Sequence, residues 1–171
     1  MLARIAHVYR RNVMTSRTAR SLRGDFPHLH LITTRWHDND VYGHVNNVQY
    51  YAFFDTVVNQ YLLKRDVLDF EHGEVIGLVV ETACQYFEPI AFPEIVIAGL
   101  RVARVGNSSV RYEIGLFRGE ASDTLDVFSA SNAPAIAEGH FVHVYVDRLN
   151  RRPKSLPAPL REALEAIQSA S

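Results

Sequence analysis

The chain has 171 residues, of which 47% are apolar and 22% charged, as expected for one domain with an ordinary core. Its formal charge of −1 gives no support for a nucleic-acid-binding surface, and no apolar run approaches the roughly 18 residues of a membrane-spanning helix. The single cysteine, Cys84, excludes an internal disulfide and a multi-cysteine zinc site. Because this favours a reducing compartment, we expect a cytoplasmic protein.

The first 24 residues differ in charge from the rest of the chain. Residues 1–24 contain six arginines and no acid, whereas residues 25–171 have a net charge of −7. An organellar presequence has this composition and would place the protein in an organellar matrix; a flexible leader or a start codon too far upstream would also produce it. We expect a basic leader over 1–24 that is flexible or not native, followed by a single domain over 25–171.

The patterns that follow predict one strand and then one long helix. Residues 29–36 are rich in β-branched and aromatic side chains and end in a polar cluster, which is typical of a strand and its exit loop. After Gly43, apolar residues follow helical spacing at 50, 53, 54, 57, 58 and 61, and a second row at 48, 51 and 62 widens the apolar surface. We expect a largely buried helix, capped by Asn46 or Asn47 and ending near Lys64.

Four further strands are predicted at 77–87, 94–105, 110–118 and 135–146, before a short amphipathic helix at 157–167. Most connections have only a few residues, which suits antiparallel neighbours. The sequence therefore predicts an α+β fold in which a curved antiparallel five-stranded sheet wraps one long helix. A free edge of such a sheet invites pairing with a second copy, so we expect a dimer.

The polar loop at 35–47 contains the best candidates for chemistry, and several interpretations compete. A calcium loop is disfavoured because Tyr42 follows Asp38 and Asp40 in the series of alternate ligand positions, and Gln49 occupies the place of the closing Glu. A transition-metal site would use side chains that match no known ligand spacing. These are His37, Asp38, Asp40 and His44. In a purely structural loop, Asp38 and Asp40 would cap turns and pair with Arg35.

The fourth interpretation is catalytic. A carboxylate one turn before a buried helix lies close to unpaired backbone amides and to the positive end of the helix dipole. Such amides can stabilise the oxyanion that forms when a carbonyl is attacked, so the loop would hold a base beside an anion hole. Gly43, which has no Cβ, would let backbone and ligand approach closely.

The run RWHDNDVYGHVNNVQYY at 35–51, followed by Phe54 and Asp55, resembles the signature of acyl-CoA thioesterases of the 4-hydroxybenzoyl-CoA thioesterase type, which have the hotdog fold. The resemblance extends over about 29–118 and 135–155 and includes the turn at 106–109. It implies that Asp40, three residues before Gly43, is the catalytic carboxylate. It also implies that the backbone N–H of Asn47 holds the thioester carbonyl.

The resemblance suggests further roles for residues near this motif. His44 would fix the loop, contact substrate or carry a proton, while Asp38 would shape the loop. Asp55 interrupts the apolar helix and would be paired, contact substrate or serve as an alternative base. Tyr50 and Tyr51 would be core aromatics or line the acyl pocket.

For the nucleotide end of coenzyme A, the resemblance points to the turn that contains Gly106, Ser108 and Ser109, with Arg101 or Arg104 meeting phosphate charge. A plain β-turn with solvated arginines is the alternative interpretation.

The expected function is hydrolysis of an acyl-CoA thioester to a carboxylic acid and coenzyme A, with no metal and no cofactor apart from the coenzyme A of the substrate. We expect a homodimer or homotetramer that binds neither nucleic acid nor membrane. A non-catalytic hotdog module that binds acyl-CoA is the main alternative, and hydratase chemistry is a third. The sequence leaves the identity of the substrate's acyl group undetermined. The polar excursion at 119–134 departs from the compact hairpin expected in relatives and could alter the pocket rim or subunit contacts.

Overall fold

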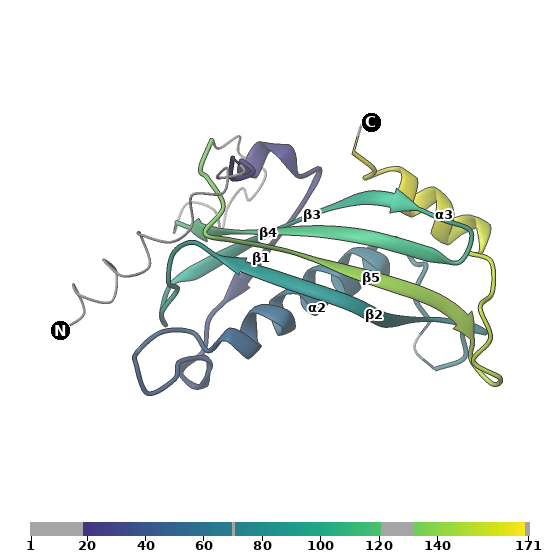
Figure 1. The fold of residues 1–171 in the computed structure, drawn as a ribbon, viewed down its shortest axis with the longest axis horizontal. Helices are drawn as coiled ribbons and strands as arrows, with labels where there is room; N and C mark the ends of the chain where they lie inside the picture. Colours follow the sequence, from purple (N-terminus) through teal and green to yellow (C-terminus); the bar gives the residue numbers. More distant parts are fainter. Residues whose placement is uncertain (1–18, 70, 121–131, 170–171) are drawn as a thin grey trace, which may run out of the picture.

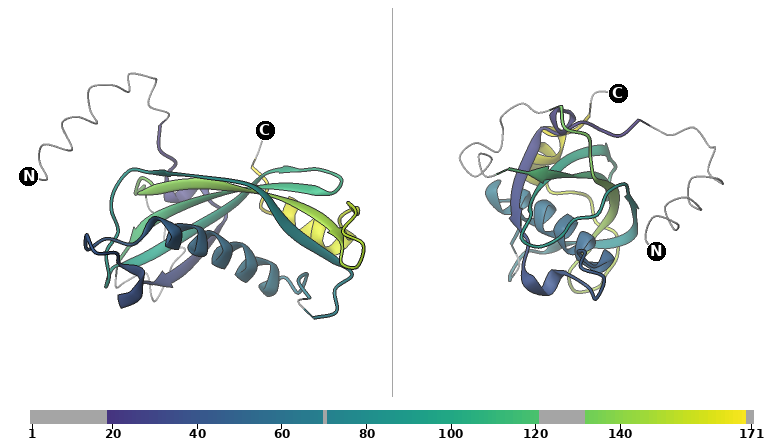
Figure 2. Two further views of the ribbon diagram at one scale, coloured as in Figure 1. Left: turned by 60° about the horizontal axis from the view of Figure 1, so that its bottom comes forward. Right: turned by 90° about the vertical axis from the view of Figure 1, so that its left-hand side faces the viewer.

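The computed structural model describes residues 19–69, 71–120 and 132–169. Within them, five strands form one antiparallel sheet in the order β1-β3-β4-β5-β2, as drawn in Figure 1. The elements are η1 (Arg23–Asp25), β1 (His28–Thr33), η2 (Trp36–Asp38), α2 (Asn47–Lys64), β2 (Val75–Tyr86), β3 (Ile95–Val105), β4 (Ser109–Gly119), β5 (Ala137–Asp147) and α3 (Ala158–Glu165). The sheet curves around α2, and α3 lies at its far end (Figure 2). The predicted hotdog arrangement is confirmed.

The long helix buries the side that its sequence pattern predicts. Its buried residues are Tyr50, Phe53, Phe54, Val57, Val58, Tyr61 and Leu62. The second apolar row is less buried than predicted, because Val48 is 64% exposed and Tyr51 is only partly covered. Asn46 is the N-cap, since its side chain accepts a hydrogen bond from the Val48 amide at 3.1 Å, and the helix ends at Lys64 as expected.

Strand order departs from the sequence prediction at one connection. β2 and β3 are separated by only eight residues, yet β2 pairs with β5 at the edge of the sheet and β3 pairs with β1 and β4. The expectation that short connections join paired strands is therefore wrong for β2 and β3. The first strand also ends earlier than predicted. The Thr34 hydroxyl, just beyond it, donates to the Glu94 carbonyl, and the chain then turns into η2.

Residues 19–26, the N-terminal strap, pack against the segment that leads into β5. The Ser21 carbonyl accepts from the Ala135 amide at 2.9 Å, and the Arg23 amide donates to the Ala133 carbonyl at 3.0 Å. Phe26 lies over Gly99, where a Cβ would come within 2.7 Å of its ring. The structure thus describes only the last six residues of the predicted leader, of which Arg20 and Ser21 are partly buried and Arg23 is buried. Residues 1–18 lie outside the described residues, as do 121–131 of the polar excursion.

Neither α2 nor α3, the two α-helices in the described part of the chain, is long and apolar enough to cross a membrane.

Two buried histidines make stability depend on pH. His28 packs against the Tyr61 ring, and His143 lies among aromatic rings; neither Nε2 atom has a hydrogen-bond partner within the described residues. Burial is the main reason that the pKa of each falls from 6.5 to about 4. As pH falls below 6.5, the unfolded chain binds protons that the folded chain does not, so the free energy of unfolding decreases.

We expect replacement of His143 by Phe to reduce this pH dependence. Between pH 7.5 and pH 5, each histidine costs roughly 2 kcal/mol of stability, at about 1.4 kcal/mol per pH unit below 6.5. Urea unfolding at the two pH values measures the loss for wild type and for His143→Phe. The variant should lose about 2 kcal/mol less than wild type. Equal losses would show that His143 is not held neutral.

Candidate active site

The loop before α2 is organised by Asp38, which is 2% exposed. Its Oδ2 accepts from the Arg35 amide at 2.7 Å, and its Oδ1 lies 3.6 Å from Arg35 Nε. Its backbone carbonyl accepts from the Asn46 amide at 2.7 Å. Asp38 therefore ties the exit of β1 to the start of α2, and Arg35 is engaged with this aspartate.

Asp40 occupies the tip of the same loop and is only partly buried. Its Oδ1 accepts from the Tyr42 amide at 2.8 Å, and its own amide donates to the His44 carbonyl at 2.8 Å. The turn closes at Gly43, whose φ of +81° is in the left-handed region that favours glycine. A Cβ at Gly43 would meet open space, so backbone conformation rather than close approach accounts for this glycine.

Asp40 keeps one oxygen available. Within the described residues, its Oδ2 has no hydrogen-bond partner and its carboxylate makes no ion pair. The structural interpretation, in which both aspartates pair with Arg35, therefore holds for Asp38 alone.

A pocket of about 360 Å³ opens at the N-terminus of α2, next to this carboxylate. It is lined by Asp40, His44, Val45, Asn47, Tyr50, Tyr86, Phe87, Glu88 and Pro89. Asn46 takes up the next amides of the helix, because its side chain accepts from Val48 and its carbonyl accepts from Gln49. The Asn47 amide has no acceptor within the described residues. The pocket thus joins an available carboxylate to an available amide at the positive end of α2.

The far wall of the pocket is aromatic and comes from the end of β2. The Tyr86 ring packs edge-on against Tyr50 with 4.9 Å between centroids. Burial raises the pKa of Tyr50, so its hydroxyl stays protonated near neutral pH. Tyr50 lines the pocket as one of its predicted roles requires. Tyr51 does not line it; its ring packs edge-on against Phe54, with 5.9 Å between centroids.

Sequence reasoning missed this wall. In the sequence, Glu88 and Pro89 indicate only the stop of a strand, and Tyr86 and Phe87 are its last residues. No local pattern shows that the end of β2 faces the start of α2. The sequence feature that could have pointed to this wall is an aromatic pair followed by Glu-Pro.

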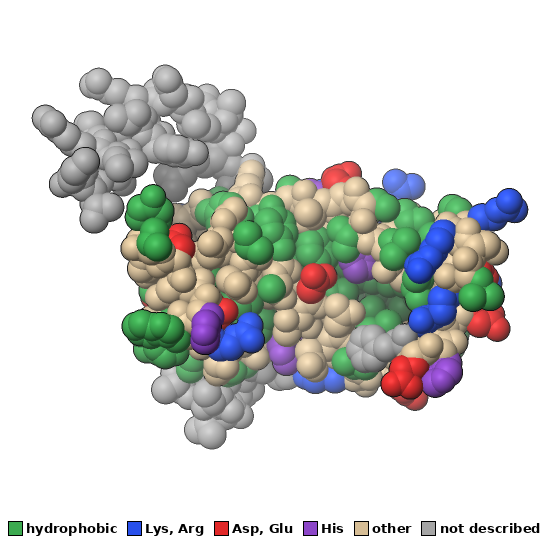
Figure 3. All heavy atoms as spheres, turned by 90° about the horizontal axis from the view of Figure 1, so that it is seen from below, with side chains coloured by type: hydrophobic (Ala, Val, Ile, Leu, Met, Phe, Trp, Pro, Cys, Tyr) green, Lys and Arg blue, Asp and Glu red, His purple; other side chains and the backbone are tan. Residues whose placement is uncertain are grey.

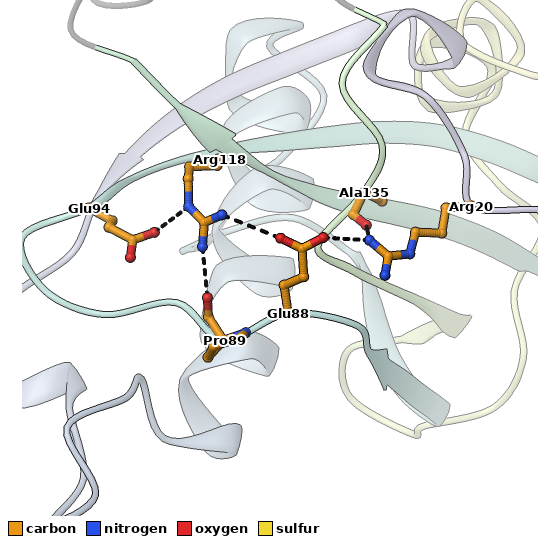
Figure 4. A network of polar contacts seen from close by, with 6 residues as sticks. All are labelled: Arg20, Glu88, Pro89, Glu94, Arg118 and Ala135. Atoms are coloured by element: carbon orange, nitrogen blue, oxygen red, sulfur yellow. Dashed lines mark hydrogen bonds and ion pairs between the residues drawn. The ribbon is translucent and has the colours of Figure 1, made fainter. Parts of the chain in front are cut away.

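Glu88 is held from two sides, as Figure 4 shows. Arg20 of the strap lies 2.6 Å from Glu88 Oε1, and Arg118 of β4 lies 3.4 Å from Oε2. Arg118 also donates to the Pro89 carbonyl at 2.9 Å and pairs with Glu94 at 2.7 Å. The hydrogen bond from Arg20 is the largest reason that the pKa of Glu88 lies below its ordinary value. The wall therefore carries an ionised, paired carboxylate.

Other predicted site residues lie away from the pocket. Asp55 is eight residues after Asn47, about 12 Å along the helix axis, and does not line the pocket. It is an exposed residue without an ion pair in the described part of the chain, and partial desolvation raises its pKa. The predicted structural pairing of Asp55 is therefore not seen.

The turn containing Gly106, Ser108 and Ser109 lies beside α3, at the opposite end of the sheet (Figure 1). Ser109 pairs with Val144, seven residues along β5 from the pocket end at Ala137, which corresponds to roughly 23 Å. The Gly106 amide donates to the Ser109 carbonyl, closing an ordinary hairpin turn. Within one chain, this turn and Asp40 do not form one site. Arg101 is paired with Glu113 at 2.7 Å, whereas Arg104 is exposed.

Seen from the α2 side, hydrophobic side chains are exposed at several places, among them the end of the molecule where the loop before α2 lies (Figure 3). Trp36, Val41 and Tyr42 of this loop are 76%, 94% and 82% exposed.

Across the residues that the structure describes, no group of three or more His, Cys, Asp or Glu side chains could hold a metal ion.

Residues 34–164 match the model of the thioesterase-like superfamily, and the chain belongs to that superfamily. Among solved structures, the PA5185 protein of Pseudomonas aeruginosa is 54% identical, with 89% of this chain and 99% of that chain covered and a TM-score of 0.79. A Thermus thermophilus thioesterase complexed with coenzyme A and Zn is 26% identical, covers 86% of this chain and 98% of its own, and has a TM-score of 0.66.

A 1,4-dihydroxy-2-naphthoyl-CoA thioesterase from Synechocystis shares the fold at 16% identity, with a TM-score of 0.67 and coverage of 80% of this chain and 93% of its own. A search of curated proteins finds no match.

Proposed function

We propose that this protein hydrolyses an acyl-CoA thioester, with Asp40 as base or nucleophile and the Asn47 amide holding the thioester carbonyl. One observation carries the proposal: a carboxylate oxygen and a helix N-terminal amide, neither with a hydrogen-bond partner among the described residues, border the same pocket. Membership of the thioesterase-like superfamily and a coenzyme A complex of a 26% identical relative support the choice of a thioester as substrate.

The chemistry needs only these groups and water. With Asp40 as general base, water attacks the carbonyl carbon while the carboxylate takes its proton, and the oxyanion is held by the Asn47 amide and the helix dipole. The carbon–sulfur bond then breaks, and the coenzyme A thiolate takes the proton back from Asp40. With Asp40 as nucleophile, its oxygen attacks the carbon, coenzyme A leaves, and water hydrolyses the mixed anhydride. His44, at the rim of the pocket, would contact substrate or carry a proton.

A second copy of the chain would complete the site. β2 is an edge strand, and Leu78, Val79 and Val80 in its middle are 39%, 47% and 60% exposed. Pairing of β2 with its counterpart would cover these residues and supply each unpaired backbone edge with partners. The pocket ends at this strand, so a partner would contribute to its outer wall. The turn at 106–109 could reach a pocket only across such an interface.

The test of the proposal is thiol release from a panel of short, branched, aromatic and long acyl-CoAs, detected with a thiol reagent. Release with at least one of them is expected, and the pattern identifies the acyl group. Tight binding of acyl-CoA without release of thiol from any of them would establish the non-catalytic module instead. Turnover of enoyl-CoA without thiol release would indicate hydratase chemistry.

We expect thiol release to survive removal of metal ions. The Thermus thermophilus relative is complexed with Zn as well as coenzyme A, but the proposed steps use a carboxylate and an amide. Dialysis against EDTA should leave kcat within error of the untreated protein. Activity lost on dialysis and restored by zinc would contradict the mechanism and indicate metal-assisted hydrolysis.

A further inference from the structure

We propose that Arg20, in the N-terminal strap, is a positioning residue for substrate binding: it holds the Phe87–Glu88 wall of the pocket in place opposite Asp40. This inference deepens the proposed function and rests on it for its kinetic readout. It assigns a role in the site to a segment that composition alone sets apart as a leader.

Backbone hydrogen bonds connect the strap to the pocket wall through one intermediate segment. On one side of residues 133–136, the Ala135 amide donates to the Ser21 carbonyl at 2.9 Å. On the other side, the Ile136 carbonyl accepts from the amides of Phe87 and Glu88 at 2.9 and 3.1 Å. Hydrogen bonds therefore connect the strap to this segment and this segment to the wall. A displacement of the strap would thus also displace the wall.

The Arg20 side chain also contacts the pocket wall directly. Its guanidinium lies 4.7 Å from the centroid of the Phe87 ring, in cation–π geometry, and 2.6 Å from Glu88 Oε1. It also reaches the Ala135 carbonyl at 3.5 Å. Figure 4 shows Arg20 and Arg118 on opposite sides of the Glu88 carboxylate. Arg20 thus contacts two residues that line the pocket, one through its ring and one through its charge.

Loss of Arg20 should affect binding more than folding or chemistry. The Arg20 side chain is 25% exposed and that of Glu88 40%, and such partly exposed pairs contribute little to stability. Within the described residues, no hydrogen bond or ion pair joins Glu88 to Asp40 or to the Asn47 amide, so kcat should change little. Without Arg20, however, the Glu88 side chain is held from one side only. Its negative charge would also be less compensated beside a pocket that must admit a polyanionic coenzyme A ester.

The test compares five variants in steady-state thiol release with the best acyl-CoA of the panel. Arg20→Met should raise KM by about five-fold, the effect of losing one partly exposed ion pair, with kcat within about two-fold of wild type. Arg20→Lys should restore part of the loss, because it keeps the charge without the planar contact to Phe87. Glu88→Gln combined with Arg20→Met should be little worse than Glu88→Gln alone. Arg152→Met, at an exposed arginine beyond the far end of β5, is the matched control and should leave KM unchanged.

An unchanged KM in Arg20→Met, or an equal rise in Arg152→Met, would overturn the inference. A fall in kcat without a rise in KM would overturn it too, since that would place Arg20 in the chemistry. The dissociation constant of a hydrolysis-resistant acyl-CoA thioether separates this inference from the proposed function. If wild type releases no thiol, the proposed hydrolysis fails. The role of Arg20 is then supported by about five-fold weaker binding in Arg20→Met and contradicted by equal binding.

Discussion

Replacement of Asp40 by Asn is expected to lower kcat by about 10²–10⁴, the usual contribution of a general base, with a much smaller change in KM. Asn keeps an Oδ1 that can accept from the Tyr42 amide, so the loop that the 2.8 Å hydrogen bond defines should persist. The variant therefore removes the charge and the basic oxygen while preserving the turn. Thiol release under saturating substrate measures the loss.

Asp66→Asn provides the matched control for this change. Asp66 is exposed just beyond the C-terminal end of α2, and its φ of 55° is a conformation that Asn tolerates. It should have wild-type activity. Wild-type turnover by Asp40→Asn would remove Asp40 from the mechanism. Asp55, the alternative base that the sequence suggests, does not line the pocket and would not take over this role.

Replacement of Asn47 by Pro is expected to lower kcat by about 10²–10³, the effect of removing one oxyanion-hole donor. Proline lacks the backbone N–H but is well accepted at the first position of a helix. The preceding residue, Asn46, has φ −59° and ψ 139°, which is the extended conformation favoured before proline. The Asn46 cap on the Val48 amide uses no atom of residue 47. The substitution therefore deletes the donor and keeps the helix.

Asn47→Ala separates the amide from the side chain. It retains the N–H and should keep kcat within a few-fold of wild type. Circular dichroism of both variants should show the same helix content. Equal losses in Asn47→Pro and Asn47→Ala would show that the side chain matters and that the amide does not hold the carbonyl.

The parts of this molecule that could be predicted from sequence are those that local chemistry decides. The apolar period of α2, the cap at Asn46 and the alternation within each strand are properties of neighbouring residues. The loop carboxylate could also be placed, because a short polar segment between a strand and the start of a helix leaves it few positions. The resemblance then selects Asp40 over Asp38, and the contact of the buried Asp38 carboxylate with Arg35 is consistent with that choice.

The parts that could not be predicted depend on contacts between distant segments. The pairing of β2 with β5 brings Tyr86 to Tyr50. No local sequence pattern predicts this contact, because the two tyrosines are 36 residues apart in the chain. Arg20 reaches Glu88 across 68 residues of sequence, so in the sequence its charge resembles part of a leader. The same topology sends the turn at 106–109 to the far end of the sheet, although motif resemblance alone groups it with the site.

The central claim is tested most directly by a crystal structure with a hydrolysis-resistant acyl-CoA analogue in which the sulfur is replaced by a methylene group. The account predicts a carbonyl oxygen about 2.7–3.1 Å from the Asn47 nitrogen, with the Asp40 carboxylate in contact with the carbonyl carbon or with a water molecule poised to attack it. A carbonyl bound elsewhere, with Asp40 and the Asn47 amide both facing solvent, would contradict it.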